Sequence, residues 1–101
     1  MSLSRDLVLS FVKLHILYHA GKKPIYGMWM MEELAEHGYD FSAGTLYPML
    51  HTMEDDGLLE SEKQVVDGKM RKYYHLTPAG EEALEQGRQK AIELLEEINK
   101  E

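Results

Sequence analysis

The dipeptide Asp67-Gly68 is the strongest local restraint on the architecture of this chain. It separates two runs of strand-like composition, residues 58–66 and 69–77, and both of its residues tolerate the positive φ angles of a two-residue hairpin turn. Three segments with helical patterns precede this hairpin, and one follows it. The chain is therefore expected to attach a small β-ribbon to a group of helices.

The first two helical segments end at clear breaks. Residues 4–20 form the first predicted helix, which Gly21 and residues 22–24 (Lys-Lys-Pro) close. Its apolar side chains cover most of its circumference, so it is expected to be buried on more than one side, with a partner subunit covering one face. The second predicted helix spans residues 25–37, and Gly38-Tyr39-Asp40 ends it.

The third predicted helix runs from Ser42, a good N-cap residue, to Gly57, which suits a left-handed helix end. Its apolar stripe consists of Leu46, Met49, Leu50 and Met53. Its other face carries Thr45, Tyr47, Pro48, His51 and Thr52, and the acidic residues Glu54, Asp55 and Asp56 crowd its C-terminal end. Hydroxyl, phenol and imidazole groups at the positive end suit insertion of the N-terminal half into a DNA groove. This segment is predicted to be a recognition helix.

Three helices followed by a two-stranded hairpin is the order of the winged helix-turn-helix fold. The short connection between the second and third helices, residues 38–41, matches the turn that this motif requires. The predicted fold class is therefore mostly α with a small β-hairpin. We expect residues 1–77 to form a winged helix-turn-helix DNA-binding domain.

Residues 78–101 are predicted to form a last helix, capped by Thr77 with Pro78 at its first position. A seven-residue repeat places Leu84, Gly87, Ala91, Leu94 and Ile98 on one narrow stripe, which we call the seam. Such a stripe is typical of a dimerisation helix, so a homodimer is expected. The alternative is a helix that packs back on the first helix of its own chain. Both arrangements hold if the two helices interleave across a two-fold axis.

Composition limits the classes of function. The chain has 101 residues, of which 44% are apolar, and suits one small domain. A net charge of −7 argues against indiscriminate nucleic-acid binding, but the Lys-Met-Arg-Lys run at residues 69–72 provides a local basic patch. The absence of cysteine, of an apolar run long enough for a membrane span and of a signal peptide leads us to expect a cytoplasmic protein.

Few residues suggest metal or catalytic chemistry. His15 and His19 stand at i and i+4, a spacing at which two imidazoles can share a metal, but no third ligand is evident nearby. They are interpreted as packing or surface histidines, and no metal or cofactor is expected. Trp29 shares a helix face with acidic residues and is expected to be half-covered by the next element. No carboxylate pair or nucleophile–base set occurs at a workable spacing, so the chain is not expected to be an enzyme.

Four segments resemble the PadR family of transcriptional regulators, in particular its short subfamily with one C-terminal helix. They are Ile16-Leu17-Tyr18 with Tyr26-Gly27, Ser42 to Leu50, Met53 to Ser61, and Arg71 to Gly80. The resemblance implies that Ser42, Thr45, Tyr47, Pro48 and His51 contact DNA from the recognition helix, and that Lys69, Arg71 and Lys72 contact it from the wing. The alternative for Tyr47 and His51 is a surface phenol and imidazole that only stabilise the turn, and the alternative for the wing cations is a solvated charge run. Lys22 and Lys23 are weaker candidates for contacts with phosphate.

The sequence departs from the family pattern at three places. The family usually has lysine or arginine near His51-Thr52, Met28 replaces a usual tyrosine, and Trp29 stands where a polar residue is common. Some relatives bind flat hydrophobic compounds between tryptophans of the last helix, which this chain lacks.

The function expected from the residues and the resemblance together is sequence-specific regulation of transcription. We expect a homodimer that binds a pseudo-palindromic operator of double-stranded DNA and acts as a repressor by blocking polymerase. A small-molecule effector, of unknown identity and site, would release it. The alternative is a winged-helix protein-interaction module that does not bind DNA on its own.

Overall fold

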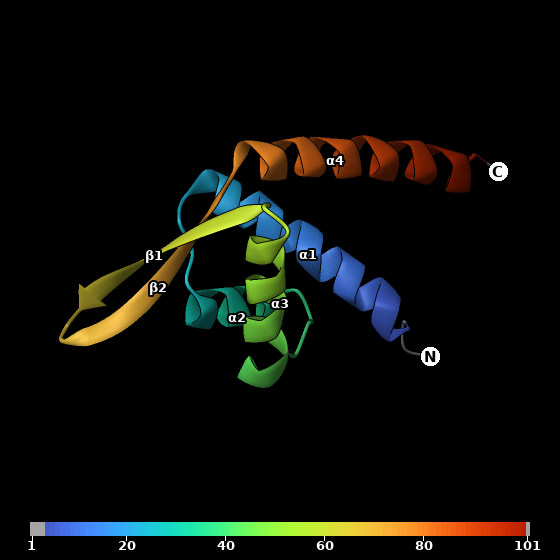
Figure 1. Ribbon diagram of the computed structural model, residues 1–101. Helices are drawn as coiled ribbons and strands as arrows, with labels where there is room; N and C mark the ends of the chain where they lie inside the picture. The colour runs from blue at the N-terminus through green and yellow to red at the C-terminus, as the bar shows by residue number, and fades with distance from the viewer. Residues whose placement is uncertain (1–3, 101) are drawn as a thin grey trace.

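Three helices surround one apolar core, and a hairpin and a long fourth helix extend from it. The computed structural model describes residues 4–100. In chain order the elements are α1 (Arg5–Lys22), α2 (Gly27–Glu36), α3 (Ala43–Asp55), β1 (Leu59–Val66), β2 (Lys69–Leu76) and α4 (Pro78–Ile98). Helix α1 lies between α4 on one side and the α2–α3 pair on the other (Figure 1). The predicted element order, mostly α with a small hairpin, is confirmed.

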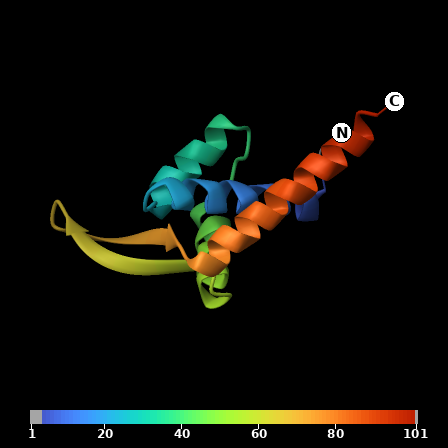
Figure 2. The same ribbon diagram turned by 90° about the horizontal axis from the view of Figure 1, so that it is seen from above.

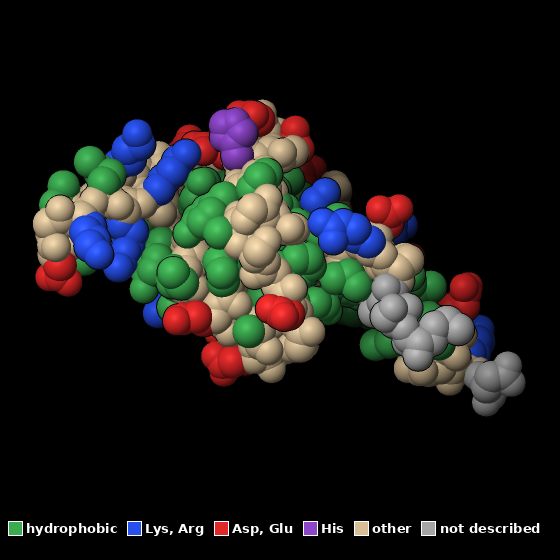
Figure 3. All heavy atoms as spheres, turned by 90° about the horizontal axis from the view of Figure 1, so that it is seen from below, with side chains coloured by type: hydrophobic (Ala, Val, Ile, Leu, Met, Phe, Trp, Pro, Cys, Tyr) green, Lys and Arg blue, Asp and Glu red, His purple; other side chains and the backbone are tan. Residues whose placement is uncertain are grey.

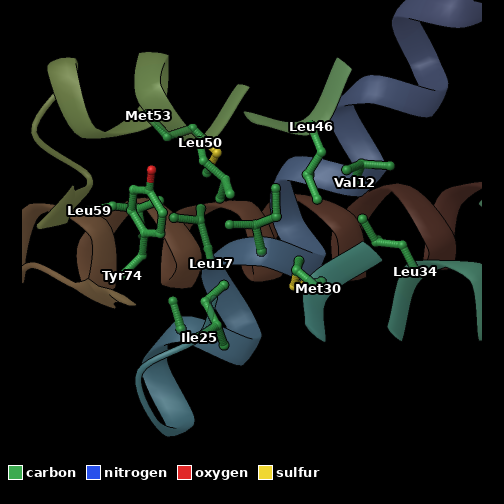
Figure 4. Packing of buried hydrophobic residues seen from close by; sticks show 12 residues of the cluster. Val12, Leu17, Ile25, Met30, Leu34, Leu46, Leu50, Met53, Leu59 and Tyr74 are labelled. Atoms are coloured by element: carbon green, nitrogen blue, oxygen red, sulfur yellow. The ribbon is translucent and has the colours of Figure 1, made fainter. Parts of the chain in front are cut away.

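The core is built from one face of each of the first three helices and from the base of the hairpin. Leu46, Leu50 and Met53 of α3 are buried as the apolar stripe predicted, while Met49 is half-buried. In Figure 4, Leu46, Leu50 and Met53 extend from α3 toward α1, which carries Val12 and Leu17. The full buried cluster is Val12, Ile16, Leu17, Ala20, Ile25, Met30, Leu34, Leu46, Leu50, Met53, Leu59 and Tyr74. This packing fixes which face of α3 remains available to solvent.

The hairpin of β1 and β2, called the wing below, has the predicted turn. Its antiparallel register runs from Leu59 opposite Leu76 to Val66 opposite Lys69. Asp67 and Gly68 both have positive φ, 52° and 78°, which matches the right-handed twist of the two strands. The wing projects away from the helices in both ribbon views (Figures 1 and 2).

The start of the second helix was predicted two residues too early. Ile25 forms an antiparallel bridge with Tyr74 of β2, in which the Ile25 amide donates to the Tyr74 carbonyl at 2.9 Å and the reverse bond measures 2.7 Å. Its backbone groups are therefore committed to the sheet, and α2 begins at Gly27. The bridge ties the wing to the segment between α1 and α2.

One other helix end differs slightly from expectation, and the ends of α3 agree with it. Helix α1 continues through Gly21 to Lys22, because the Lys23 amide still donates to the His19 carbonyl at 3.3 Å. Helix α3 begins after Ser42 and is followed by Gly57 with φ +80°, as predicted. Its interior is continuous through Pro48.

Helix α4 starts at the predicted cap. The Thr77 side chain accepts from the Gly80 amide at 3.0 Å and donates to the Gly57 carbonyl at 2.6 Å, so the cap also fastens α4 to the end of α3. Residues 88–100 are all exposed, and the C-terminal half of α4 extends beyond the rest of the domain (Figure 2). Within residues 4–100, no helix has both the length and the apolar character needed to cross a membrane.

Candidate nucleic-acid interface

Helix α3 presents the predicted polar and aromatic face. Tyr47, Pro48, His51 and Thr52 are exposed on the side opposite the buried stripe, and Thr45 is half-buried. Figure 3 views the molecule from below, where a largely uncharged area lies between Lys and Arg side chains on the wing side and others toward the N-terminus. This face holds the candidate base-contacting residues.

Tyr47 does not project freely from this face. Its ring lies across Gly27 at the start of α2: a Cβ at position 27 would be 2.0 Å from the Tyr47 Cε1 atom. The same ring lines a hollow of about 400 Å³ shared with Tyr26, Arg71 and Tyr74. Its side chain remains 43% exposed, so Tyr47 packs against α2 while part of its ring stays accessible.

Helix α3 starts at the expected N-cap residue. Ser42 occupies the N-cap position, and its carbonyl accepts from the Thr45 and Leu46 amides at 3.1 and 3.0 Å. Ser42 is therefore the N-cap residue, as predicted, although its hydroxyl makes no capping hydrogen bond. The exposed hydroxyl beside the positive helix end remains free to meet a phosphate.

His51 lies one turn beyond Tyr47 and is exposed. Its Nε2 atom is 3.3 Å from Asp55 Oδ2, and about two thirds of each side chain is accessible. The carboxylate is close enough to orient the ring. Pro48, between Tyr47 and His51, has no N–H for the carbonyl of Gly44, which leaves that acceptor to solvent or a ligand.

The three cations predicted for the wing do not form one edge. Successive β2 side chains alternate between faces. Arg71 lies 4.0 Å from the Tyr26 ring and donates to the Tyr73 hydroxyl at 3.4 Å, whereas Lys72 lies 3.5 Å from Glu54 Oε1 of α3. Lys69, beside the turn, is exposed.

Glu54 links α3 to both strands of the wing. Its carboxylate accepts from the Ser61 hydroxyl at 2.6 Å and pairs with Lys72. The Ser61 hydrogen bond, reinforced by the Lys72 charge, lowers the pKa of Glu54. Burial lowers the pKa of Lys72, but its contacts with Tyr74 and Glu54 outweigh burial, and the pKa is raised overall. The positive charge of Lys72 is thus partly balanced by Glu54 within the protein.

Two cations that sequence reasoning missed flank α3 from the other side. Arg5 and Lys13 of α1 line a groove of about 360 Å³ together with Thr45, Pro48 and Thr52 of α3. Their spacing of eight residues places them on one face of α1, which the sequence could have shown. Their position beside α3 depends on how the two helices pack, which it could not. Lys22 and Lys23 instead lie beside Tyr18 and Trp29.

The seam residues of α4 fall into two groups. Leu84 and Gly87 are half-buried against α1, where a Cβ at position 87 would lie 2.8 Å from Leu14 Cδ2. Ala91, Leu94 and Ile98 are exposed. The first half of α4 therefore packs on α1 of its own chain, which was the alternative to a dimerisation helix. A groove of about 380 Å³ remains between α1 and α4, lined mainly by Phe11, Leu14, Tyr18, Leu84, Gly87 and Ala91.

Two further expectations concern α1 and α2. Trp29 is half-buried as expected, but the preceding helix covers it: its ring lies 5.4 Å from the His19 ring, edge to face. His15 and His19 were predicted to lack a third metal ligand nearby. This is wrong, because the fold brings His37, at the end of α2, within 4.8 Å of both.

Known proteins resemble this chain in sequence and in fold. Residues 16–86 match the transcriptional regulator PadR-like family. Transcriptional regulator Rv3488 of Mycobacterium tuberculosis is 49% identical over 94 residues, covering 93% of this chain and 88% of the relative.

Solved structures of PadR regulators have the same fold. A PadR-like transcriptional regulator from Bacillus cereus superimposes with a TM-score of 0.84 at 30% identity, covering 94% of both chains. A PadR family regulator from Eggerthella lenta gives a TM-score of 0.79 at 31% identity, covering 94% of this chain and 88% of that one. This chain belongs to the PadR-like family of transcriptional regulators.

Proposed function

We propose that this regulator is a repressor that binds a pseudo-palindromic operator as a homodimer. The observation that carries the proposal is the exposed face of α3, which has cations on two sides. Arg5 and Lys13 lie on the α1 side, and Lys69 and Arg71 lie on the wing side. Cations that flank an uncharged reading face suit phosphates on either side of a groove. We include Ser42, Thr45, Tyr47, Pro48 and His51 as the α3 contacts.

The residues divide by the DNA groups that they suit. Thr45, Tyr47 and His51 offer hydroxyl and ring groups that suit base edges or thymine methyl groups, whereas Ser42 and the cations suit phosphates. Among the wing cations, Lys72 contributes less than Lys69 because Glu54 already pairs with it. This division predicts different losses for different substitutions.

A dimer is proposed because one chain offers few cations and leaves much apolar surface uncovered. Phe11, Leu94, Leu95 and Ile98 are exposed large apolar residues of α1 and α4, and such surfaces commonly form interfaces. Two copies of α3 related by a two-fold axis would read half-sites about one DNA turn apart, roughly 34 Å. We propose residues 78–101 as the dimerisation helix and residues 1–77 as the DNA-binding domain.

Release by an effector follows from the same arrangement. The groove between α1 and α4 adjoins the exposed seam, so a small apolar compound bound there would change how the two helices pack. A ligand that favours one dimer geometry over another shifts the spacing of the two α3 helices and thereby the affinity for DNA.

Binding-site selection with the purified protein, followed by shift assays at two salt concentrations, tests the proposal. We expect one enriched, two-fold symmetric sequence. Failure to enrich any sequence, with no shift of the protein's own upstream DNA at low salt, would instead favour a winged-helix module that binds other proteins.

A pair of variants separates reading from positioning. Tyr47→Ala should weaken binding to the selected site by about tenfold or more while leaving non-specific binding almost unchanged. Lys13→Gln should weaken both kinds of binding similarly and reduce the salt slope by about two per dimer, at roughly 0.9 per phosphate. Lys90→Gln on the exposed face of α4 is the control. Equal loss of specific and non-specific binding in Tyr47→Ala would mean that Tyr47 only positions α3.

A further inference from the structure

Three histidines from two helices meet outside the proposed DNA interface. His15 and His19 lie one turn apart on α1, and His37 caps the end of α2. One ring nitrogen from each can be chosen so that all three lie within 4.8 Å of one another. His15 and His19 are half-buried and His37 is exposed, so the cluster is held by the fold yet open to solvent.

The three rings lie close together. The His15 and His37 ring centroids are 4.8 Å apart, and His15 and His19 stack in near-parallel planes at 6.3 Å. Tetrahedral zinc with Zn–N bonds near 2.0–2.1 Å places its nitrogens about 3.3 Å apart. Side-chain rotations that bring the nitrogens together by about 1.5 Å would complete three protein ligands around a metal, with a fourth position open.

An acidic residue supports the third histidine. Glu33, one turn before His37 on α2, accepts or shares a proton with His37 Nε2 at 3.1 Å. This leaves His37 Nδ1 as the metal ligand and gives the carboxylate–histidine arrangement that orients imidazoles in metal sites. Glu33 is a positioning residue in this arrangement.

The protonation of the rings favours the same role. Burial lowers the pKa of His15 and of His19, and it outweighs the nearby Glu33 carboxylate, which raises both. Neutral imidazole is the form that binds a metal. Without cysteine in the chain, an all-histidine site suits zinc, copper or nickel rather than thiolate chemistry.

We propose that His15, His19 and His37 bind one Zn²⁺ ion per chain, with Glu33 orienting His37. The ion would fasten the end of α2 to α1, directly before the turn of residues 38–42 that leads into α3. Metal binding would therefore stiffen the connection that sets the direction of the recognition helix. The site itself does not depend on whether the chain binds DNA.

Cobalt titration tests the site without DNA. Co²⁺ added to the metal-free protein should produce the visible absorption bands of a tetrahedral ion, saturating at one equivalent, and Zn²⁺ should abolish them. Trp29 is the chain's only tryptophan, and its ring lies 5.4 Å from His19. Its fluorescence should therefore fall as Co²⁺ binds, with the same midpoint.

Matched variants decide which residues hold the ion. His37→Asn is the main variant, because His37 is exposed and its loss should leave folding intact, as circular dichroism would verify. His75→Asn is the control, since His75 pairs with Glu60 at 3.2 Å much as His37 pairs with Glu33. We expect His37→Asn to abolish the cobalt bands and His75→Asn to leave them unchanged.

The supporting residue gives a graded outcome. Glu33→Gln should weaken binding by roughly 10–100-fold, less than the loss of any ligand. Cobalt bands that survive in His37→Asn, or that never appear in the unchanged protein, would overturn the proposal. The three rings would then only pack with Trp29 and Tyr39. If the unchanged protein shows the cobalt bands but binds no DNA, the proposed function is contradicted and the metal site is not.

Discussion

Tyr47 of α3 packs against Gly27 of α2, and each constrains the other. A Cβ at position 27 would fall 2.0 Å from the Tyr47 ring, so Gly27→Ala must push the ring outward. The ring is 43% exposed and has room to turn, so we expect a modest loss of stability, of about 1 kcal/mol. We expect a larger loss of specific DNA binding, measured by the shift assay on the selected site.

Gly44→Ala is the matched control for this prediction. A Cβ at position 44 would only make an ordinary contact, 3.7 Å from the Ser42 hydroxyl, and alanine favours a helix by roughly 0.5–1 kcal/mol over glycine. The Gly27→Ala change should have no further effect in a Tyr47→Ala background. An undiminished effect there would show that position 27 acts through something other than the Tyr47 ring.

At the residue scale, the sequence predicted which side chains face outward but not what they touch. The exposed face of α3 followed from helical spacing, a local property. The contact of Tyr47 with Gly27 joins two helices, and no periodicity within either helix reveals it. The same holds for His37: the His15–His19 pair is visible in the sequence, while the third histidine comes close only because α1 packs on α2.

At the element scale, Glu54 and Ser61 connect the recognition helix to the wing. Ser61→Ala removes the hydrogen bond that lowers the pKa of Glu54, and we expect a loss of about 1 kcal/mol of unfolding free energy at neutral pH. Because the folded pKa lies below the ordinary glutamate value of 4.5, this stability is fully present above about pH 4.5. It should be lost as the pH falls through the lowered folded pKa.

Urea unfolding of both proteins across this pH range checks the prediction. The difference between them should shrink in acid, because a protonated Glu54 gains little from Ser61. Ser10→Ala is the control, since the Ser10 hydroxyl donates to the Asp6 backbone carbonyl, whose charge does not change with pH. A difference for Ser61→Ala that stayed constant down to pH 3 would show that Glu54 is not involved.

The elements themselves were largely readable from local signals. Asp67-Gly68, Thr77-Pro78 and Gly57 each act within a few residues, and the structure shows the turn, the cap and the helix end that they predicted. The start of α2 was not readable, because Ile25 pairs with Tyr74, almost fifty positions later. Local propensity gives no information about that partner.

At the scale of the whole molecule, the seven-residue repeat of α4 serves two different surfaces. Its first members, Leu84 and Gly87, pack on α1 of the same chain, whereas Leu94 and Ile98 remain exposed. A repeat in the sequence identifies a stripe of apolar side chains but not the helix that covers it. The exposed second half is the part that a partner subunit would cover.

This division leads to a prediction about assembly. Leu94→Glu places a charge on the exposed half of the seam, so a dimer formed there should dissociate at micromolar concentration in sedimentation measurements. The side chain is 56% exposed in the single chain, so the unfolding free energy of the monomer should change by no more than about 0.5 kcal/mol.

Gln89→Glu provides the comparison, because it adds the same charge to the same helix on the side away from the seam. It should leave the mass of the assembly unchanged. Leu94→Glu should also bind a two-half-site operator no better than an isolated half-site, since the second copy of α3 is then no longer attached. A dimer that survives Leu94→Glu would place the interface elsewhere, and the uncovered face of α1 around Phe11 would become the next surface to test.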